Sequence, residues 1–251
     1  MTSKKGLIVG VANEFSIAWG CAKILHATGA ELAITYQNDK ARTYVQPLAE
    51  SVSSSIFMPL DVTKPDQLDD LLRAVTAQWG RLDFVLHAIA FAPKADLQGR
   101  VTDCSREGFA MAMDISCHSL IRLAKAAEPL MIDGGSIITM SYYGSEKVVP
   151  NYNLMGPVKA ALEASVRYLA VELGPQGIRV NALSPGPIKT RAASGLANFD
   201  RLMEKAACEA PMHQLVTIED VGEAAAFLIS DKARHITGQV IYVDGGYQVR
   251  G

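Results

Sequence analysis

"GLIVGVANEFSIAWGCAKILHATGAELAITYQ", residues 6–37, is the stretch that decides the fold. A β-branched apolar run ends at Gly10, a segment with helical periodicity follows, and a second apolar run closes the unit. Such a turn presents backbone N–H groups and a helix N-terminus to phosphate. We expect Ser16 to cap the helix and Gly20 to let it pack closely on the sheet. The spacing differs from G-x-G-x-x-G, so the turn alone also allows a simple strand–helix connection.

The same rhythm continues along the chain, where short apolar runs alternate with longer helical segments. Continuous apolar strands separated by helices indicate a parallel sheet covered on both faces. No linker, repeat or low-complexity tract interrupts the pattern. We therefore predict an α/β fold: one doubly wound, Rossmann-type domain over residues 1–251, with seven parallel strands and helices on both faces. The strands are expected at 7–11, 32–36, 55–60, 82–89, 135–142, 178–185 and 240–246.

Composition excludes several classes of partner. The net charge is −2 and the charged residues are scattered, which disfavours nucleic acid and anionic membranes. The apolar runs fall short of the roughly 20 residues that span a bilayer, so no membrane insertion is expected. The five histidines show no metal-ligand spacing, and no metal site is predicted. The four cysteines form no C-x-x-C pair, which predicts reduced thiols, each buried or inert, in the cytoplasm.

The ends of three further predicted strands carry candidate contacts for a dinucleotide. Gln37 stands where an acidic residue would bind the ribose hydroxyls of NAD; it is neutral, and Lys40 and Arg42 lie beyond it, so NADH is favoured over NADPH. Asp61 ends the third predicted strand and either accepts from the adenine amino group or caps a helix. The small residues at 88–90 allow backbone to run close to a ribose, although tight packing explains them equally.

The stretch "SYYGSEKVVPNYNLMGPVK" (141–159) carries the candidate chemistry. Lys159 follows Tyr152 by seven residues, and seven helical steps of about 100° return to nearly the same face. A lysine beside a phenol favours the phenolate and makes the hydroxyl a better proton donor or oxyanion partner. Pro157 lies between them and is tolerable only if the helix starts near Tyr152.

With these residues in view, the chain resembles the short-chain dehydrogenase/reductase superfamily over nearly its whole length. The shared features are the glycine turn, Asp61-Val62, "NALSPGPIKT" (181–190) and "VDGGY" (243–247). Within that superfamily it is similar to the NADH-dependent enoyl-[acyl-carrier-protein] reductases of bacteria and plastids. That similarity rests on "GVANEFSIAWG" (10–20), "TYQND" (35–39), "HAIAFAP" (87–93) and "SYYGSEKVVPNYNLMGPVKAALEASVRYLAVELG" (141–174). The Tyr152-x6-Lys159 spacing is its most specific element, since ordinary members have Tyr-x3-Lys.

The resemblance implies a cytoplasmic homotetramer that reduces the double bond of trans-2-enoyl-acyl carrier protein with NADH in bacterial-type fatty-acid synthesis. Tyr152 would bind the thioester carbonyl and stabilise the enolate, Lys159 would bind the nicotinamide ribose, and Tyr142 would be the second active-site tyrosine. Substrate contacts would come from Ala92, Tyr142, Tyr152 and Ala192. The cofactor would contact Gly10, Ser16, Ile17, Gln37, Asp61, Val62, Ile89, Lys159, Ile188 and Thr190.

The positions counted back from Lys159 differ from those of ordinary members of the superfamily. Tyr142 occupies the place of the ordinary serine, and Met155 that of the ordinary tyrosine. A phenol moved up one helical turn suits a carbonyl one bond away from the carbon that receives hydride. The rival predictions are another short-chain carbonyl reductase and a catalytically silent dinucleotide-binding regulator. Asp114 replaces the asparagine of an ordinary proton relay and receives no catalytic role, and Tyr143 is interpreted mainly as packing.

The segment 190–220 is an insert between the last two predicted strands. We expect a substrate lid at about 190–210, with small and apolar residues suited to an acyl chain; an amphipathic packing helix is the alternative. The basic residues Lys189, Arg191, Arg201 and Lys205 are candidates for contact with an acidic carrier protein, but Asp200 and Glu204 interrupt them. The lid residues are Ala192, Ala193, Ser194, Gly195 as hinge, Leu196 and Phe199.

Overall fold

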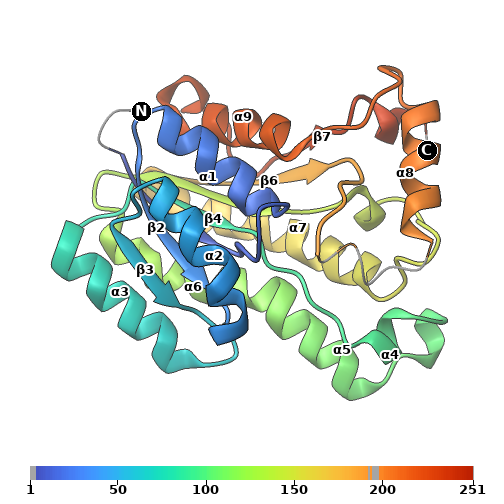
Figure 1. The fold of residues 1–251 in the computed structure, drawn as a ribbon, viewed down its shortest axis with the longest axis horizontal. Helices are drawn as coiled ribbons and strands as arrows, with labels where there is room; N and C mark the ends of the chain where they lie inside the picture. The colour runs from blue at the N-terminus through green and yellow to red at the C-terminus, as the bar shows by residue number, and fades with distance from the viewer. Residues whose placement is uncertain (1–3, 192, 194–197, 251) are drawn as a thin grey trace.

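The computed structural model describes residues 4–191, 193 and 198–250. Its centre is a parallel sheet in the order β3-β2-β1-β4-β5-β6-β7 (Figure 1). From β1 the chain crosses to β2 and then to β3 on one side of the sheet, and the next crossover returns from β3 to β4 on the other side of β1. The switch point therefore lies between β1 and β4. The strands are β1 (Lys5–Val9), β2 (Glu31–Tyr36), β3 (Ile56–Pro59), β4 (Phe84–His87), β5 (Gly135–Met140), β6 (Ile178–Pro185) and β7 (Val240–Val243).

Helices connect the strands and cover both faces (Figure 1). The α-helices are α1 (Ile17–Ala27), α2 (Asp39–Ser51), α3 (Pro65–Trp79), α4 (Lys94–Leu97), α5 (Arg106–Met113), α6 (Ser119–Ala127), α7 (Met155–Leu173), α8 (Phe199–Glu209) and α9 (Ile218–Ile229). A π-helical segment, η2 (Asp114–His118), joins α5 to α6. The 3-10 turns are η1 (Val101–Asp103), η3 (Glu128–Leu130), η4 (Tyr143–Ser145), η5 (Gly174–Gln176), η7 (Asp231–Ala233) and η8 (Tyr247–Val249).

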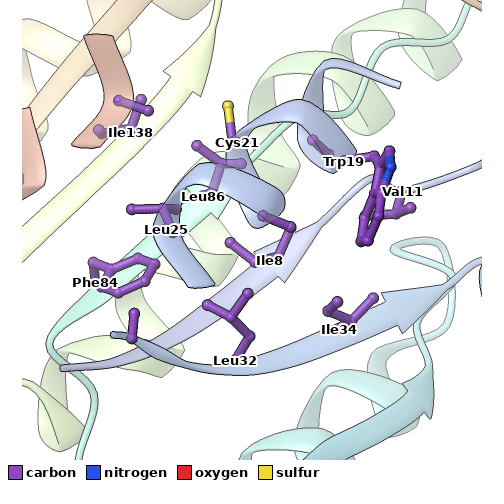
Figure 2. Packing of buried hydrophobic residues seen from close by; sticks show 14 of the residues in the cluster. Ile8, Val11, Trp19, Cys21, Leu25, Leu32, Ile34, Phe84, Leu86 and Ile138 are labelled. Carbon is purple, nitrogen blue, oxygen red and sulfur yellow. The ribbon is translucent and has the colours of Figure 1, made fainter. Parts of the chain in front are cut away.

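Each strand is apolar on both sides because each side meets helices. Ile8 of β1 packs into a cluster with α1, α2 and α9, whereas its neighbours Leu7 and Val9 pack with α3, α6 and α7 on the other face. Figure 2 shows the first cluster, in which Trp19 and Leu25 of α1 lie over the strands. This two-sided burial explains why the apolar runs are continuous instead of alternating.

A third cluster lies beyond the carboxyl ends of the strands. It joins Tyr143 and Tyr152 from the segment after β5, Ala206 of α8 and Tyr247 near the C-terminus. Helix α8 therefore packs against the tyrosine-bearing segment, and Figure 1 shows it at the right-hand end of the molecule beyond β6 and β7. The predicted site and the predicted lid region meet at this cluster.

The α/β fold class and the seven parallel strands are confirmed, with strand ends shifted by up to a few residues. The expected partner of Gly20 is wrong. A Cβ on Gly20 would lie 2.3 Å from the carbonyl oxygen of Ile218, so this glycine admits α9, not the sheet. Gly222 of α9 faces it, since a Cβ there would lie 2.8 Å from Gly20 O. In the part of the chain that the structure describes, no helix is long and apolar enough to cross a membrane.

Candidate active site

The turn after β1 fits a phosphate-binding loop. Gly10 has φ +110°, and a Cβ there would lie 2.1 Å from the carbonyl oxygen of Ala88, so β1 and β4 approach too closely for any side chain. Ser16 stands at the N-cap of α1, but its hydroxyl does not cap the helix. It accepts instead from the backbone N–H groups of Ala12 (3.0 Å) and Asn13 (3.1 Å), which tightens the loop. The first N–H groups of α1 thus keep no side-chain cap and suit the pyrophosphate of a dinucleotide.

The other predicted cofactor residues lie at the same edge of the sheet, at or just beyond the carboxyl ends of β2, β3, β4 and β6. Gln37 is exposed directly after β2. Asp61 accepts from Thr63 N (3.0 Å) and Thr63 Oγ1 (2.7 Å), so it closes a turn and does not cap α3, whose N-cap is Lys64. Val62 O accepts from Arg122. Partly buried positions in this set are Ile17, Ile89, Ile188 and Thr190.

Lys159 is buried in the second turn of α7. Its Nζ donates to the carbonyl oxygen of Met140, the last residue of β5, at 2.5 Å. Burial lowers the pKa of Lys159 from 10.5 to about 8, and the Glu163 carboxylate opposes that shift. Among the described residues Met140 O is its one hydrogen-bond acceptor, which leaves two N–H donors for the hydroxyl groups of a ribose.

Tyr152 does not lie on the helix, and the helical-face argument for it is wrong. Helix α7 begins at Met155, and Tyr152 sits in the turn before it, donating its N–H to Val149 O (3.1 Å). The residues on either side, Asn151 and Asn153, have left-handed φ values of 65° and 42°. Asparagine is among the side chains that tolerate this conformation best. The tyrosine is therefore placed by a turn with asparagines on both sides.

Pro157 does not disturb this geometry. It is the third residue of α7, so its missing N–H is one of the first four that lack an intrahelical acceptor anyway. The first regular bond follows at once, from Val158 N to Leu154 O at 3.4 Å. The condition that the helix start near Tyr152 is met within three residues.

Two tyrosine rings stand together in the buried cluster. The centroids of Tyr142 and Tyr152 are 4.8 Å apart with their planes at 62°. Tyr142 Oη is buried and, among the described residues, has no hydrogen-bond partner. Tyr143 packs edge-on against Tyr142 and Tyr247, each at 5.4 Å, and hydrogen-bonds Tyr247, which favours packing over chemistry for it.

Burial raises the pKa values of Tyr142 and Tyr152 above the ordinary 10. The phenolate that Lys159 was expected to favour is therefore disfavoured, because burial is the largest influence on both phenols. Each phenol keeps its proton and is a hydrogen-bond donor. A protonated phenol is the form that polarises a carbonyl oxygen.

The remaining residues singled out from the sequence lie in several different places. Ala92 packs against the third cluster, to which Tyr143 and Tyr152 belong. Ala192, Ser194, Gly195 and Leu196 lie outside the described residues, whereas Phe199 begins α8. Cys21 and Cys117 are buried, whereas Cys208 is exposed. Asp114 is paired with Arg122, which supports leaving it out of the chemistry.

Sequence reasoning missed three residues here: Glu163, Ser141 and Ser145. Glu163 is buried, and its carboxylate accepts from both serine hydroxyls. One signal was available, since Glu163 follows Lys159 by four residues and so lies on the same helix face. Nothing in the sequence shows that this face is turned inward.

Comparisons with known proteins identify the family of this chain. Residues 10–248 match the family model described as enoyl-(acyl carrier protein) reductase. The enoyl-[acyl-carrier-protein] reductase [NADH] 1 of Rhizobium meliloti is 51% identical over 100% of this chain and 92% of its own length. The corresponding protein of a Nostoc species is 50% identical, covering 100% and 98%.

Solved structures show the same likeness. The enoyl-(acyl-carrier-protein) reductase of Anaplasma phagocytophilum, in complex with NAD, has a TM-score of 0.96 at 50% identity and covers 100% of this chain and 96% of its own. The NADH enzyme of Aquifex aeolicus has a TM-score of 0.97 at 49% identity, with 100% and 98% covered.

Proposed function

The chain belongs to the enoyl-[acyl-carrier-protein] reductase family, and from that premise we propose that it reduces the carbon–carbon double bond of trans-2-enoyl-acyl carrier protein with NADH. The product is the saturated acyl-acyl carrier protein, and the reaction belongs to bacterial-type fatty-acid synthesis. The observation that carries this proposal is the pair of buried, protonated phenols, Tyr142 and Tyr152, placed ahead of α7, with Met155 where a ketone reductase has its tyrosine.

NADH is held, in this proposal, by the edge of the sheet described above. The uncapped N-terminus of α1 takes the pyrophosphate, and Lys159 donates to the nicotinamide ribose. When bound, the cofactor supplies the hydride that the β-carbon receives. The remaining contacts are Gly10, Ser16, Ile17, Gln37, Asp61, Val62, Ile89, Ile188 and Thr190.

Tyr152 acts on the substrate oxygen. Its phenol donates a hydrogen bond to the thioester carbonyl and stabilises the enolate, which is then protonated at the α-carbon. Such a donor is worth on the order of 10²–10³ in rate. Tyr142 lies against the Tyr152 ring, and its hydroxyl, which has no partner in the part of the chain that the structure describes, is available to the same substrate group. Ala92 and Ala192 complete the substrate contacts.

The partner and the setting follow from the same proposal. The substrate arrives on acyl carrier protein, and the segment at about 190–210 acts as the lid of a single domain spanning residues 1–251. The basic candidates for carrier contact are weak, because Lys189 is paired with Asp200 (3.2 Å) and Lys205 with Glu209 (3.7 Å). Four free cysteines suit a reducing cytoplasm.

Self-association into a homotetramer is supported by exposed apolar side chains on one face. Tyr168 and Val171 of α7 are 73% and 78% exposed, and Ile121 of α6 is also exposed. Helices α6 and α7 pack on the same face of the sheet, in the second core cluster. Large exposed apolar side chains on neighbouring helices are typical of an interface.

A substrate comparison tests the reaction. NADH and NADPH oxidation are followed with a crotonyl thioester and with an acetoacetyl thioester, at equal protein concentration. Turnover of the enoyl compound with NADH is expected, with little or none of the ketone. Turnover of the ketone alone would favour a short-chain carbonyl reductase, and cofactor binding without turnover of either would favour a silent dinucleotide-binding regulator.

A further inference from the structure

Glu163 is a buried carboxylate beside the site. It lies on α7, one turn after Lys159, and its residue is only 5% exposed. A carboxylate taken out of water is costly unless it is paired and hydrogen-bonded. The partners that offset this cost show what the residue does.

Its hydrogen bonds bracket the tyrosine segment. One carboxylate oxygen, Oε1, accepts from Ser141 Oγ and from Ser145 Oγ, the latter at 2.6 Å. Tyr142 lies between these two serines. Because Lys159 also bonds Met140, two consecutive residues at the end of β5 are fixed by two residues one turn apart on α7. The path of the chain into Tyr142 is thus set by α7.

The charges around Lys159 come from three elements. Glu163 faces it from α7, His87 from β4, and Cys117 from the π-helical segment. His87 is buried between Thr139 and Ser119 (2.9 and 2.8 Å), and burial lowers its pKa to about 3, so it is neutral. Cys117 is a buried thiol. Of these three groups, Glu163 provides the negative charge at neutral pH.

We propose that Glu163 is a positioning residue with two roles: its charge keeps the Lys159 ammonium protonated for the cofactor, and its Oε1 holds the Ser141–Ser145 segment so that Tyr142 meets the substrate. The effect of these two roles on turnover rests on the proposed function. The effect on the charge of Lys159 does not depend on which substrate the protein reduces.

The geometry separates the two roles. Since both serines bond the same oxygen, Glu163→Gln retains an acceptor at Oε1 and removes the charge. The double variant Ser141→Ala/Ser145→Ala keeps the charge and removes both hydrogen bonds. Each variant tests one role and controls for the other.

The first measurement is the pKa of Lys159 in the ligand-free protein. It is followed by NMR with lysine labelled at Cε, and Lys159→Met assigns the signal. In Glu163→Gln we expect the pKa to fall by about one unit or more, because an opposite charge is lost. In the serine variant it stays where it is in the parent protein. An unchanged pKa in a folded Glu163→Gln protein overturns the charge role, whether or not any thioester is reduced.

The second measurement is NADH binding and turnover across pH 6–10. In Glu163→Gln the loss of NADH affinity at alkaline pH moves to lower pH, and affinity at pH 6 matches the parent. In the serine variant kcat falls at least about tenfold, since a small misplacement of a reacting group is costly, while NADH affinity is unchanged. Unchanged kcat in a folded serine variant overturns the holding role. Failure of the parent to reduce any enoyl thioester would instead refute the proposed function.

Discussion

In our proposal, the ammonium group of Lys159 makes NADH binding depend on pH near neutrality. Its pKa is lowered to about 8 by burial, so the group is charged below that pH and neutral above it. Binding that uses the charge raises the lysine pKa in the complex, and affinity therefore falls as the pH rises through about 8 and beyond. A titration of NADH affinity by fluorescence, from pH 6 to 10, measures this.

Lys159→Ala should remove that pH dependence and weaken NADH binding about 10- to 100-fold at pH 7, the usual effect of losing a hydrogen bond to a charged group. Denaturant unfolding of the same sample shows whether the variant is folded. Unchanged NADH affinity in folded Lys159→Ala would refute the ribose role of the lysine.

Tyr152 and Tyr143 form a matched pair for the phenol chemistry. Both are buried tyrosines of one cluster, but Tyr143 hydrogen-bonds Tyr247. Tyr152→Phe should lower kcat by about 10²–10³ with NADH affinity unchanged, because it removes the donor to the carbonyl. Tyr143→Phe should leave kcat within a few-fold and affect stability instead. Steady-state kinetics with a crotonyl thioester decide this, and equal losses in both variants would contradict the assignment.

At this scale the sequence predicted residue identities better than their surroundings. Tyr152 and Lys159 were singled out by their spacing and Tyr142 by the family resemblance, and the structure brings the two tyrosines together beside the helix that carries the lysine. The phenolate was predicted wrongly because the sequence does not show that both phenols are buried. Glu163 was missed for the same reason, since an exposed and a buried glutamate look alike in sequence.

At the scale of elements, the turn before α7 sets the position of Tyr152. A Cβ on Gly144 would lie 2.5 Å from Cδ1 and 2.9 Å from Cε1 of Tyr152, so Gly144→Ala must displace that ring. We expect kcat to fall about tenfold or more while NADH affinity is retained. Gly174→Ala is the control, because nothing lies within 4 Å of its added Cβ. A Gly144→Ala protein with the kcat of the parent would show that the ring position is not critical.

The α1–α9 contact makes a second element-level prediction, about stability. The Cβ of Gly20→Ala would meet the backbone of α9 at 2.3 Å, so the two helices must separate. Overpacking of this kind costs about 1–3 kcal/mol of unfolding free energy. Urea unfolding measures it against Gly174→Ala, and equal midpoints for the two variants would contradict the contact.

Elements were predicted well where the signal is local. Apolar runs and helical periodicity located all seven strands, because both faces of the sheet are covered. The partner of Gly20 and the placement of Tyr152 on the helix were wrong, since both depend on contacts or backbone turns with no local pattern. The asparagines at 151 and 153 were a usable signal for a turn, as they tolerate left-handed φ.

At the scale of the whole molecule, the parallel order explains why distant motifs meet. All seven strands point the same way, so residues that follow each strand gather at one edge. The gathering of Gly10, Gln37 and Asp61 at this edge was predictable from this rule. The tyrosine half was not, because Tyr143, Ala206 and Tyr247 meet in a cluster outside the sheet, and no sequence periodicity links them.

The exposed apolar side chains of α7 bear on how copies of the chain assemble. In our proposal the exposed Tyr168 and Val171 of α7 are covered by a second copy, so burying a charge there is costly. Tyr168→Glu/Val171→Glu should dissociate the tetramer into smaller species, as measured by light scattering after size exclusion. Tyr44→Glu is the control: Tyr44 is 54% exposed on α2, which packs on the opposite face of the sheet. A monomeric parent protein, or a double variant that stays tetrameric, would contradict the assignment of α7 to the interface. A loss of turnover that accompanies dissociation would show that the site needs the neighbouring copy to hold α7 in place.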